Sequence, residues 1–472
     1  MTELLSESHE KNVDELRRRL GIKQNFDCIE RHLLVAERDV VFFFVDGFVK
    51  DGEMQRVMQT LLSLKDIGSA SDLERRIPYA EIEVCRDIKK IVRATLSGQS
   101  VILSESFGGE AILLDLRTYP ARGTEEPESD KVMQGAHDGF VETLVMNTAL
   151  IRRRIRDQRL RMEHFSIGEC SATDVVVCYM EGVADTETLD EVRASLNKIK
   201  PKALSLGFQS LAESMIRRGW FNPFPKIRTT ERPDTAAAQL LEGSIIILCD
   251  TSPQVMILPT SIFDYLEETD DFYFPPLTGT YLRLVRTAIL LLSVFVTPLW
   301  YLAVEYAERL PSALSFLVPD AVGPLPLILQ IFLVEIAIDG LKIASTNTPN
   351  ILSSSLSIIG GLILGDFAVE VGWLCADVIL YMAFVAIANF AQQNYELGYA
   401  FKFSRMIILT LVYFFGMLGL FGGAIIFCFL VATNKTFGKK RRYLYPLIPF
   451  NAKDFFRLIV RQRKQDFDGN GQ

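Results

Sequence analysis

Hydrophobic and polar positions divide the chain into two parts near residue 284. Residues 1–283 alternate short apolar runs with charged segments, as buried strands and amphipathic helices do. Beyond residue 284 the apolar runs lengthen: 287–304 has 18 residues without a formal charge, and 406–433 has 28. A run of about 18 apolar residues can cross a bilayer. The pattern predicts an α/β soluble region followed by an all-α multi-span membrane domain.

The membrane domain is predicted over 284–433 with about four spans. Two further apolar segments, 327–344 and 351–390, carry charges or glycines, and 406–433 is the clearest single span. The tail 434–472 is strongly basic, which places it in the cytoplasm by the positive-inside rule. Because the N-terminus is charged and resembles no cleaved signal peptide, we expect the soluble region on the same side. An even number of spans follows, and four is the simplest.

Charge and composition exclude several function classes. Residues 284–472 carry 15 Lys and Arg against 12 Asp and Glu, a net charge of +3. Because the whole chain has a net charge of −8, residues 1–283 have a net charge of −11. An acidic soluble region argues against nucleic-acid binding. The 7 Cys show no C-x-x-C spacing and the 4 His all precede residue 165, which predicts no disulfide framework and no metal site. Phosphate-binding and nucleophile motifs are absent from the sequence, so we expect no cofactor and no enzymatic activity.

The soluble region contains an internal duplication. Residues 40–65 read like 175–200, and 95–119 read like 240–265, with offsets of 135 and 145 residues. Each copy is predicted as a β-α-α-β-β unit. This gives two tandem subdomains, 1–137 and 138–283, with 123–138 and 228–235 as loops. The basic run 152–161 is predicted to end a long helix with a solvated face; contact with anionic lipid or with an acidic loop is the alternative.

The segment 350–365, NILSSSLSIIGGLILG, has a polar face and an aliphatic face. At helical spacing the polar face holds Asn350, Ser353, Ser354, Ser357 and Gly361. Hydroxyl groups that face a wet cavity suit an ion pathway, so these five residues are the pore-lining candidates. The alternative is an amphipathic connector on the membrane surface, or helix packing through serine.

Acidic residues also interrupt the apolar half. Glu335 and Asp339 share a helix face at i, i+4 and are the charge-selecting candidates, because buried carboxylates usually face a pore or a partner. Two alternatives are an Asp339–Lys342 ion pair and a helix cap by Asp366. Small-xxx-small spacing makes Gly361 with Gly365, and Gly419 with Gly423, candidates for helix packing.

Several strings together resemble the GerA family of spore germination receptor A-subunits. They include EEPESDKVMQGAHDGFVETLVMNTALIRRRIRD, ERPDTAAAQLLEGSIIILCD, ILPTSIFDY, VEVGW and NYELGYAFKFSRM. The resemblance runs from about residue 27 to 456. A short N-terminal tail, together with FYFPPLTGTYLRLVR and YLYPLIPFN, is similar to the stage V sporulation protein AF branch.

The resemblance implies a multi-pass protein of the spore inner membrane whose soluble region and tail face the cytoplasm. It further implies a homo-oligomeric ion channel that releases monovalent cations and amplifies germination, with a small membrane protein as a possible partner. Two other functions stay open: a nutrient receptor A-subunit acting with partner receptor chains, and an accessory component of dipicolinate release. Subunit number and gating stimulus do not follow from the sequence.

Overall fold

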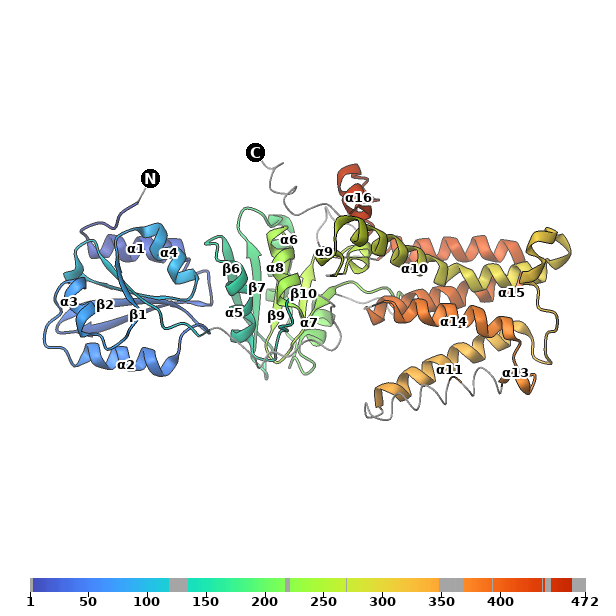
Figure 1. Cartoon of the computed structure of the whole chain (residues 1–472), viewed down its shortest axis with the longest axis horizontal. Coiled ribbons are helices and arrows are strands. Elements are labelled where there is room, and N and C mark those ends of the chain that lie inside the picture. Colours follow the sequence, from blue (N-terminus) through green and yellow to red (C-terminus); the bar gives the residue numbers. More distant parts are fainter. Residues whose placement is uncertain are drawn as a thin grey trace. The chain divides into compact units, whose positions relative to one another are not determined.

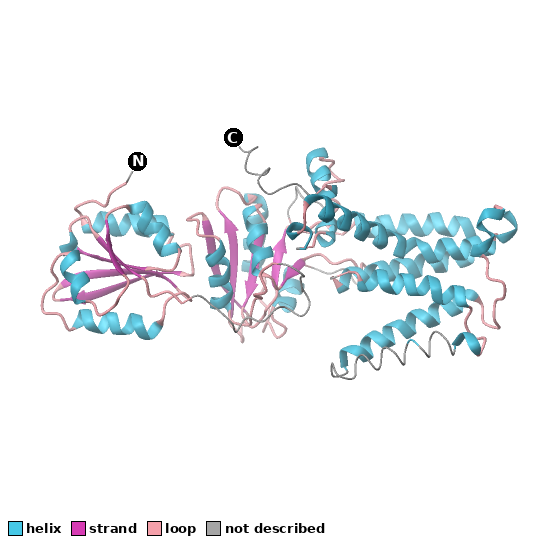
Figure 2. Cartoon of the chain, in the orientation of Figure 1, coloured by secondary structure: helices cyan, strands magenta, loops and turns pink. Residues whose placement is uncertain are grey.

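The computed structural model of the chain divides into two compact units, which are described separately (Figure 1). The first comprises Met1–Arg218, Ile227–Thr260 and Thr436–Arg441, and the second Gly219–Lys226, Ser261–Lys435 and Arg442–Gln472. The residues that the structure describes are 3–118, 135–216, 221–268, 270–347, 361, 368–392, 394–434, 436–437 and 443–460. Among these residues, strands occur only in the first unit, and the second unit is helical (Figure 2).

Lobe 1 of the first unit is a five-stranded antiparallel sheet with helices on both faces. The strands pair in the order β1-β2-β4-β5-β3. Successive side chains of a strand point to opposite faces, so Val41 and Phe43 pack with α1 and α4, while Val40 and Phe42 pack with α2 and α3. The elements are α1 (His9–Leu20), β1 (Cys28–Val35), β2 (Arg38–Val45), α2 (Asp51–Leu62), α3 (Ala70–Arg76), β3 (Ile82–Cys85), α4 (Ile88–Leu96), β4 (Ser100–Ser104), the short η1 (Glu105–Phe107) and β5 (Ala111–Leu114).

Lobe 2 repeats this architecture. Its strands pair antiparallel in the order β6-β7-β9-β10-β8. Val176 and Cys178 pack with α5 and α8, and Val175 and Val177 pack with α6 and α7 on the other face. The elements are α5 (Leu144–Arg154), β6 (Leu160–Ile167), β7 (Thr173–Met180), α6 (Thr186–Lys198), α7 (Phe208–Met215), β8 (Arg228–Thr230), α8 (Pro233–Leu241), β9 (Ile245–Cys249) and β10 (Val255–Leu258).

The register of the two sheets shows the duplication residue by residue. Val40 lies opposite Ser104 in lobe 1, and Val175 lies opposite Cys249 in lobe 2. The differences, 175 − 40 = 135 and 249 − 104 = 145, are the offsets expected from the sequence. The repeating unit is longer than the predicted β-α-α-β-β, however. Each copy adds a leading helix, an edge strand on each side of the sheet and the helix α3 or α7.

The first helix of each copy makes the same pair of side-chain hydrogen bonds. Asn12 in α1 accepts a hydrogen bond from the Ser6 amide (2.8 Å) and donates one to the Ser6 carbonyl (2.7 Å). Asn147 in α5 does the same with Val141, at 2.8 and 2.6 Å. Residues 12 and 147 are again 135 apart. The duplicated segment therefore includes residues 6–20, which the sequence comparison had left outside the repeat.

The second unit is a helical bundle. Its elements are η2 (Ile262–Leu266), α9 (Asp270–Tyr273), α10 (Pro276–Glu305), η3 (Ala307–Arg309), η4 (Ser312–Leu317), α11 (Leu327–Asn347), α13 (Ala368–Glu370), α14 (Ala376–Phe390), α15 (Tyr395–Ala432) and α16 (Ala452–Ile459). Among the described residues, α10 and α15 are apolar and long enough to cross a membrane. This agrees with a membrane-associated protein.

The segment α15 is a helical hairpin, so the single span predicted over 406–433 is wrong. Gly416 has φ 54° and ψ −130°, which breaks the helix. A methyl group on Gly423 would lie 2.9 Å from Ile408 Cγ1, although these residues would be roughly 22 Å apart in a continuous helix. The chain therefore reverses at Gly416, and residues 395–415 pack against 417–432.

Glycine is required along this hairpin for two reasons. The backbone of Gly416 is in a region that other residues rarely adopt, and a Cβ there would also meet the Tyr306 hydroxyl at 2.7 Å. A Cβ on Gly419 would clash with the Leu411 carbonyl oxygen. Gly419 and Gly423 thus lie where the two arms of the hairpin leave no room for a side chain.

Candidate functional site

Most of the predicted pore-lining residues are not part of the described structure. Asn350, Ser353, Ser354 and Ser357 lie outside the described residues, and so does the packing candidate Gly365. Gly361 is described, and its backbone is helical. The pore-lining role of this segment therefore stays a prediction.

The two charge-selecting candidates belong to a cluster of ion pairs between α11 and α15, here called the charge cluster: Glu335, Asp339, Lys402 and Arg405. Glu335 Oε1 accepts a hydrogen bond from Arg405 Nη2 at 2.7 Å and lies 3.3 Å from Lys402 Nζ. Lys402 Nζ also donates to Asp339 Oδ2. Because 335 and 339 lie one turn apart on α11, and 402 and 405 one turn apart on α15, two acidic groups face two basic ones.

Three members of the charge cluster are buried, whereas the Asp339 side chain is 32% exposed, and the cluster connects three helices. The side chains of Glu335 and Arg405 are 4% and 1% exposed, respectively. Arg405 Nη1 donates to the Ser293 carbonyl of α10 at 3.0 Å. Charges in an apolar interior are destabilising by several kcal/mol unless they are paired, so these contacts hold α10, α11 and α15 together. Glu335 Oε2 is buried without a hydrogen-bond partner in the described part of the chain.

The sequence reasoning missed both basic members of the cluster. The predicted last span begins at Met406, just after these two cations. The signal was the string FKFSRM, which places Lys402 and Arg405 three residues apart at the edge of the apolar run. The expected alternative, an Asp339–Lys342 pair, does not form; Lys342 Nζ lies 4.3 and 5.0 Å from the ring centroids of Tyr395 and Tyr399.

A second group of ion pairs surrounds the start of α10. Arg283 Nη1 lies 2.9 Å from Glu267 Oε1, and Arg286 Nη2 lies 2.6 Å from Glu268 Oε2. Asp271, whose side chain is fully buried, accepts from Arg286 Nη1 at 2.9 Å. Arg283 also donates to the Leu458 carbonyl of α16. These three acidic residues therefore hold in place both arginines that precede the apolar run of α10.

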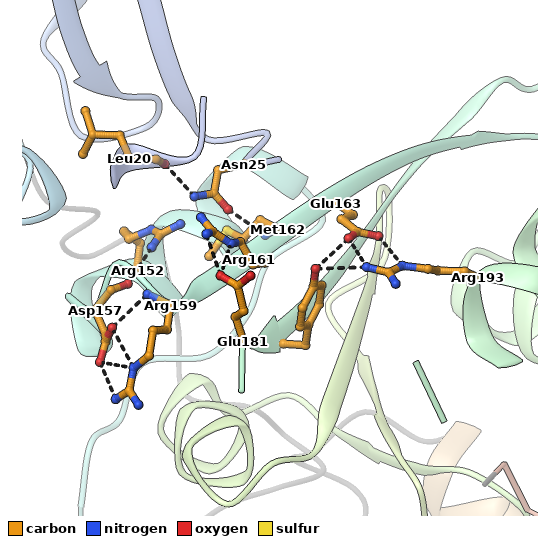
Figure 3. Close-up of polar contacts among 11 residues, drawn as sticks. Leu20, Asn25, Arg152, Asp157, Arg159, Arg161, Met162, Glu163, Glu181 and Arg193 are labelled. Carbon is orange, nitrogen blue, oxygen red and sulfur yellow. Dashed lines mark hydrogen bonds and ion pairs between the residues drawn. The ribbon is translucent and has the colours of Figure 1, made fainter. Parts of the chain in front are cut away.

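The two lobes of the first unit meet at an edge strand. Asn25 of lobe 1 donates to the Leu20 carbonyl at 2.8 Å and accepts from the Met162 amide of β6 at 3.0 Å, as Figure 3 shows. The Phe26 amide donates to the Met162 carbonyl at 2.8 Å. Lobe 1 thereby satisfies backbone groups at the outer edge of β6, which would otherwise be left unpaired.

A buried ion pair lies at the same junction. Arg152 Nε and Nη2 lie 2.7 and 3.0 Å from the two carboxylate oxygens of Asp27, and their side chains are 0% and 1% exposed. The predicted solvated face holds for Arg153, Arg156 and Arg159, which are exposed, but not for Arg152. α5 ends at Arg154, and Leu160 and Arg161 belong to β6. Burial raises the pKa of the adjacent Cys28 thiol, and the Asp27 carboxylate adds to the shift.

Within the described residues, no three His, Cys, Asp or Glu side chains gather as metal ligands would. The expectations that the chain binds no metal and no cofactor stay predictions, as does the expectation that it is not an enzyme.

Residues 14–469 match the family model described as Bacillus/Clostridium GerA spore germination protein. The chain belongs to the GerA family. The resemblance predicted from the sequence strings is confirmed at this level.

Several proteins with sequence similarity support the same assignment. Stage V sporulation protein AF of Bacillus subtilis (strain 168) is 35% identical over 96% of this chain and 92% of that protein. Spore germination proteins KA and A1 of the same organism are 27% and 26% identical and cover 95% and 93% of this chain. Similarity along the whole length to GerA germination and sporulation proteins supports a role in spore germination.

One solved structure is similar to the first part of the chain. It is the crystal structure of the N-terminal domain of the A subunit of the Bacillus megaterium spore germinant receptor GerK3, with 22% sequence identity and a TM-score of 0.42. The match covers 54% of this chain and 96% of that domain.

Proposed function

We propose that the chain is a membrane subunit of an oligomeric ion channel that releases monovalent cations during spore germination and amplifies the response. In this proposal it has no catalytic activity of its own. The observation that carries it is the charge cluster within an apolar helical bundle. Ionisable groups at such positions usually mark an ion pathway or the helices that form one.

The proposal includes a topology. The chain would lie in the spore inner membrane, with the first unit and the basic tail in the cytoplasm. A turn at Gly416 brings residue 432 back to the end of the bundle where α15 begins, which fits an even number of crossings. Several copies, with a small membrane protein or other germination proteins as partners, would surround the pathway.

The charge cluster refines the predicted roles of Glu335 and Asp339. Both carboxylates are neutralised by Lys402 and Arg405 in this structure, so they would attract cations only when the pairs open. We therefore propose that the cluster, while its ion pairs are formed, holds α11 against α15. The hydroxyl-bearing residues of 350–361 remain the proposed lining of the pathway.

Potassium efflux from vesicles tests the proposal. The full-length protein is reconstituted with and without its small membrane partner, and K⁺ release is recorded for the wild type, Ser354→Leu and Ser357→Leu. Ser312→Leu is the matched control, because Ser312 is exposed in η4 outside the proposed lining. We expect Ser354→Leu and Ser357→Leu to insert into the membrane but to lose K⁺ efflux, while the control keeps it.

Two results would overturn the proposal in different ways. Unchanged efflux in both Ser354→Leu and Ser357→Leu would contradict the pore-lining assignment. If the wild type gives no efflux under either condition, the channel function itself is wrong.

A further inference from the structure

A groove beside the charge cluster lies between three helices of the second unit. It is partly open to the outside. Its polar lining comes from Asp339 and Lys342 on α11, Asn389 on α14, and Tyr395, Tyr399 and Lys402 on α15. Two cations, one carboxylate, two phenol groups and an amide thus converge on a small space inside an apolar bundle.

The ionisable groups around the groove do not balance. Lys342, Lys402 and Arg405 supply three positive charges, and Glu335 and Asp339 supply two negative charges. Lys402 and Arg405 are paired with the carboxylates, whereas no carboxylate in the described structure lies within ion-pair distance of Lys342. Lys342 instead lies over the faces of Tyr395 and Tyr399. One net positive charge among apolar helices favours an anion in the groove.

The position of the groove indicates where this anion comes from. Leu397 and Phe401 of α15 pack in one cluster with Tyr265 and Leu266, so the groove lies at the end of the bundle where α10 begins. Phe390, which lines the groove, is 63% exposed, and Ile343 and Ile387, each next in sequence to a lining residue, are 58% and 65% exposed. Lysine and tyrosine at the end of apolar helices, flanked by exposed apolar side chains, are typical of the membrane–water interface.

We propose that the groove binds the phosphate of an anionic membrane lipid. Lys342 supplies the charge contact, and the Tyr395, Tyr399 and Asn389 side chains are available as hydrogen-bond donors. The exposed apolar residues beside the groove would contact the acyl chains. This inference rests on the membrane location in the proposed function, but not on ion conduction.

Lipid-dependent thermal stabilisation tests the inference. Full-length protein is purified in detergent and depleted of lipid, and its melting temperature is measured as phosphatidylglycerol or phosphatidylcholine is added. Lys342→Gln removes the charge and Lys342→Arg keeps it. Lys453→Gln is the control, since it removes a lysine from exposed α16 of the same unit. Inorganic phosphate alone is the arm that detects a soluble ligand.

We expect phosphatidylglycerol, and not phosphatidylcholine, to stabilise the wild type, Lys342→Arg and Lys453→Gln at similar concentrations. In Lys342→Gln the half-maximal concentration should rise about fivefold, the effect of roughly 1 kcal/mol for one basic residue. Three results would overturn the inference: an unchanged midpoint in Lys342→Gln, equal stabilisation by phosphatidylcholine, or the same Lys342-dependent stabilisation by inorganic phosphate.

Alkaline extraction of membranes separates this inference from the proposed function. A chain that is released by alkali would contradict both the membrane assignment and the lipid site. A chain that stays in the membrane but melts independently of phosphatidylglycerol would contradict the lipid site alone.

Discussion

The buried pair between Asp27 and Arg152 provides a quantitative test of how the two lobes are held together. Both side chains are almost completely buried, and the two hydrogen bonds are bidentate. Removing one partner leaves an uncompensated charge in the interior, which costs about 3–5 kcal/mol. Replacing both with apolar residues of similar volume avoids that penalty. We therefore expect Arg152→Met to be strongly destabilising and the Asp27→Leu/Arg152→Met double variant to recover most of the loss.

Arg154→Met is the matched control. Arg154 is on the same helix and pairs with Asp138, but these side chains are 21% and 23% exposed. A pair that is partly screened by water contributes about 0–1 kcal/mol. The same type of substitution two residues away should therefore have a much smaller effect on the first unit.

Hydrogen exchange measured by mass spectrometry on the detergent-solubilised full chain is the assay. In Arg152→Met, amides of β1 and β6 should exchange roughly 10²- to 10³-fold faster, up to the limit set by local opening. In Arg154→Met and in the double variant the change should be less than about tenfold. Equal acceleration in Arg152→Met and Arg154→Met would refute the reasoning from burial.

Three further predictions concern the charge cluster, the hairpin and pH. Glu335→Gln should lower stability in detergent melts by about 3–5 kcal/mol, with Glu335→Leu/Arg405→Leu less affected; equal losses would contradict an ion-pair role. With the native cysteines replaced, Phe401→Cys/Phe427→Cys should be joined by a short bifunctional thiol reagent, because the ring centroids of these residues are 5.8 Å apart. A straight helix would separate the two residues by roughly 39 Å and prevent it. Hydrogen bonds from His32 to its acidic neighbours raise its pKa, so its stabilising contribution is complete below about pH 6.5 and is lost as pH rises through the folded-state pKa. The melting-temperature difference between wild type and His32→Gln should therefore shrink from pH 5.5 to 8.5. A difference that grows over this range would contradict a raised pKa of His32 in the folded state.

The central strands of both lobes could be predicted because they are buried on two faces. Residues 40–45 and 175–180 are almost continuously apolar, as strands between two helical layers are. The edge strands gave no such signal. β1 reads CIERHLLV, and only its two end residues, Cys28 and Val35, are buried, so its polar residues concealed it. The longer repeat became visible only when Asn12 and Asn147 were seen to make the same hydrogen bonds.

The second unit shows why a continuous apolar run can mislead. Residues 406–433 contain no charge, and an apolar turn in a bundle needs only a glycine that tolerates positive φ. Hydropathy therefore could not distinguish a hairpin at Gly416 from one long span. The ion pairs of Lys402 and Arg405 with α11 are contacts between residues more than 60 apart in sequence, so helical spacing alone could not reveal them.

Current through a planar bilayer is the most direct measurement of whether the apolar unit conducts cations. The purified chain, alone and with the proposed small membrane partner, is incorporated under a KCl gradient, and the reversal potential is recorded. We predict a current that reverses close to the K⁺ equilibrium potential and disappears with Ser354→Leu. Absence of current, or reversal at the Cl⁻ equilibrium potential, would contradict a cation pathway through this protein.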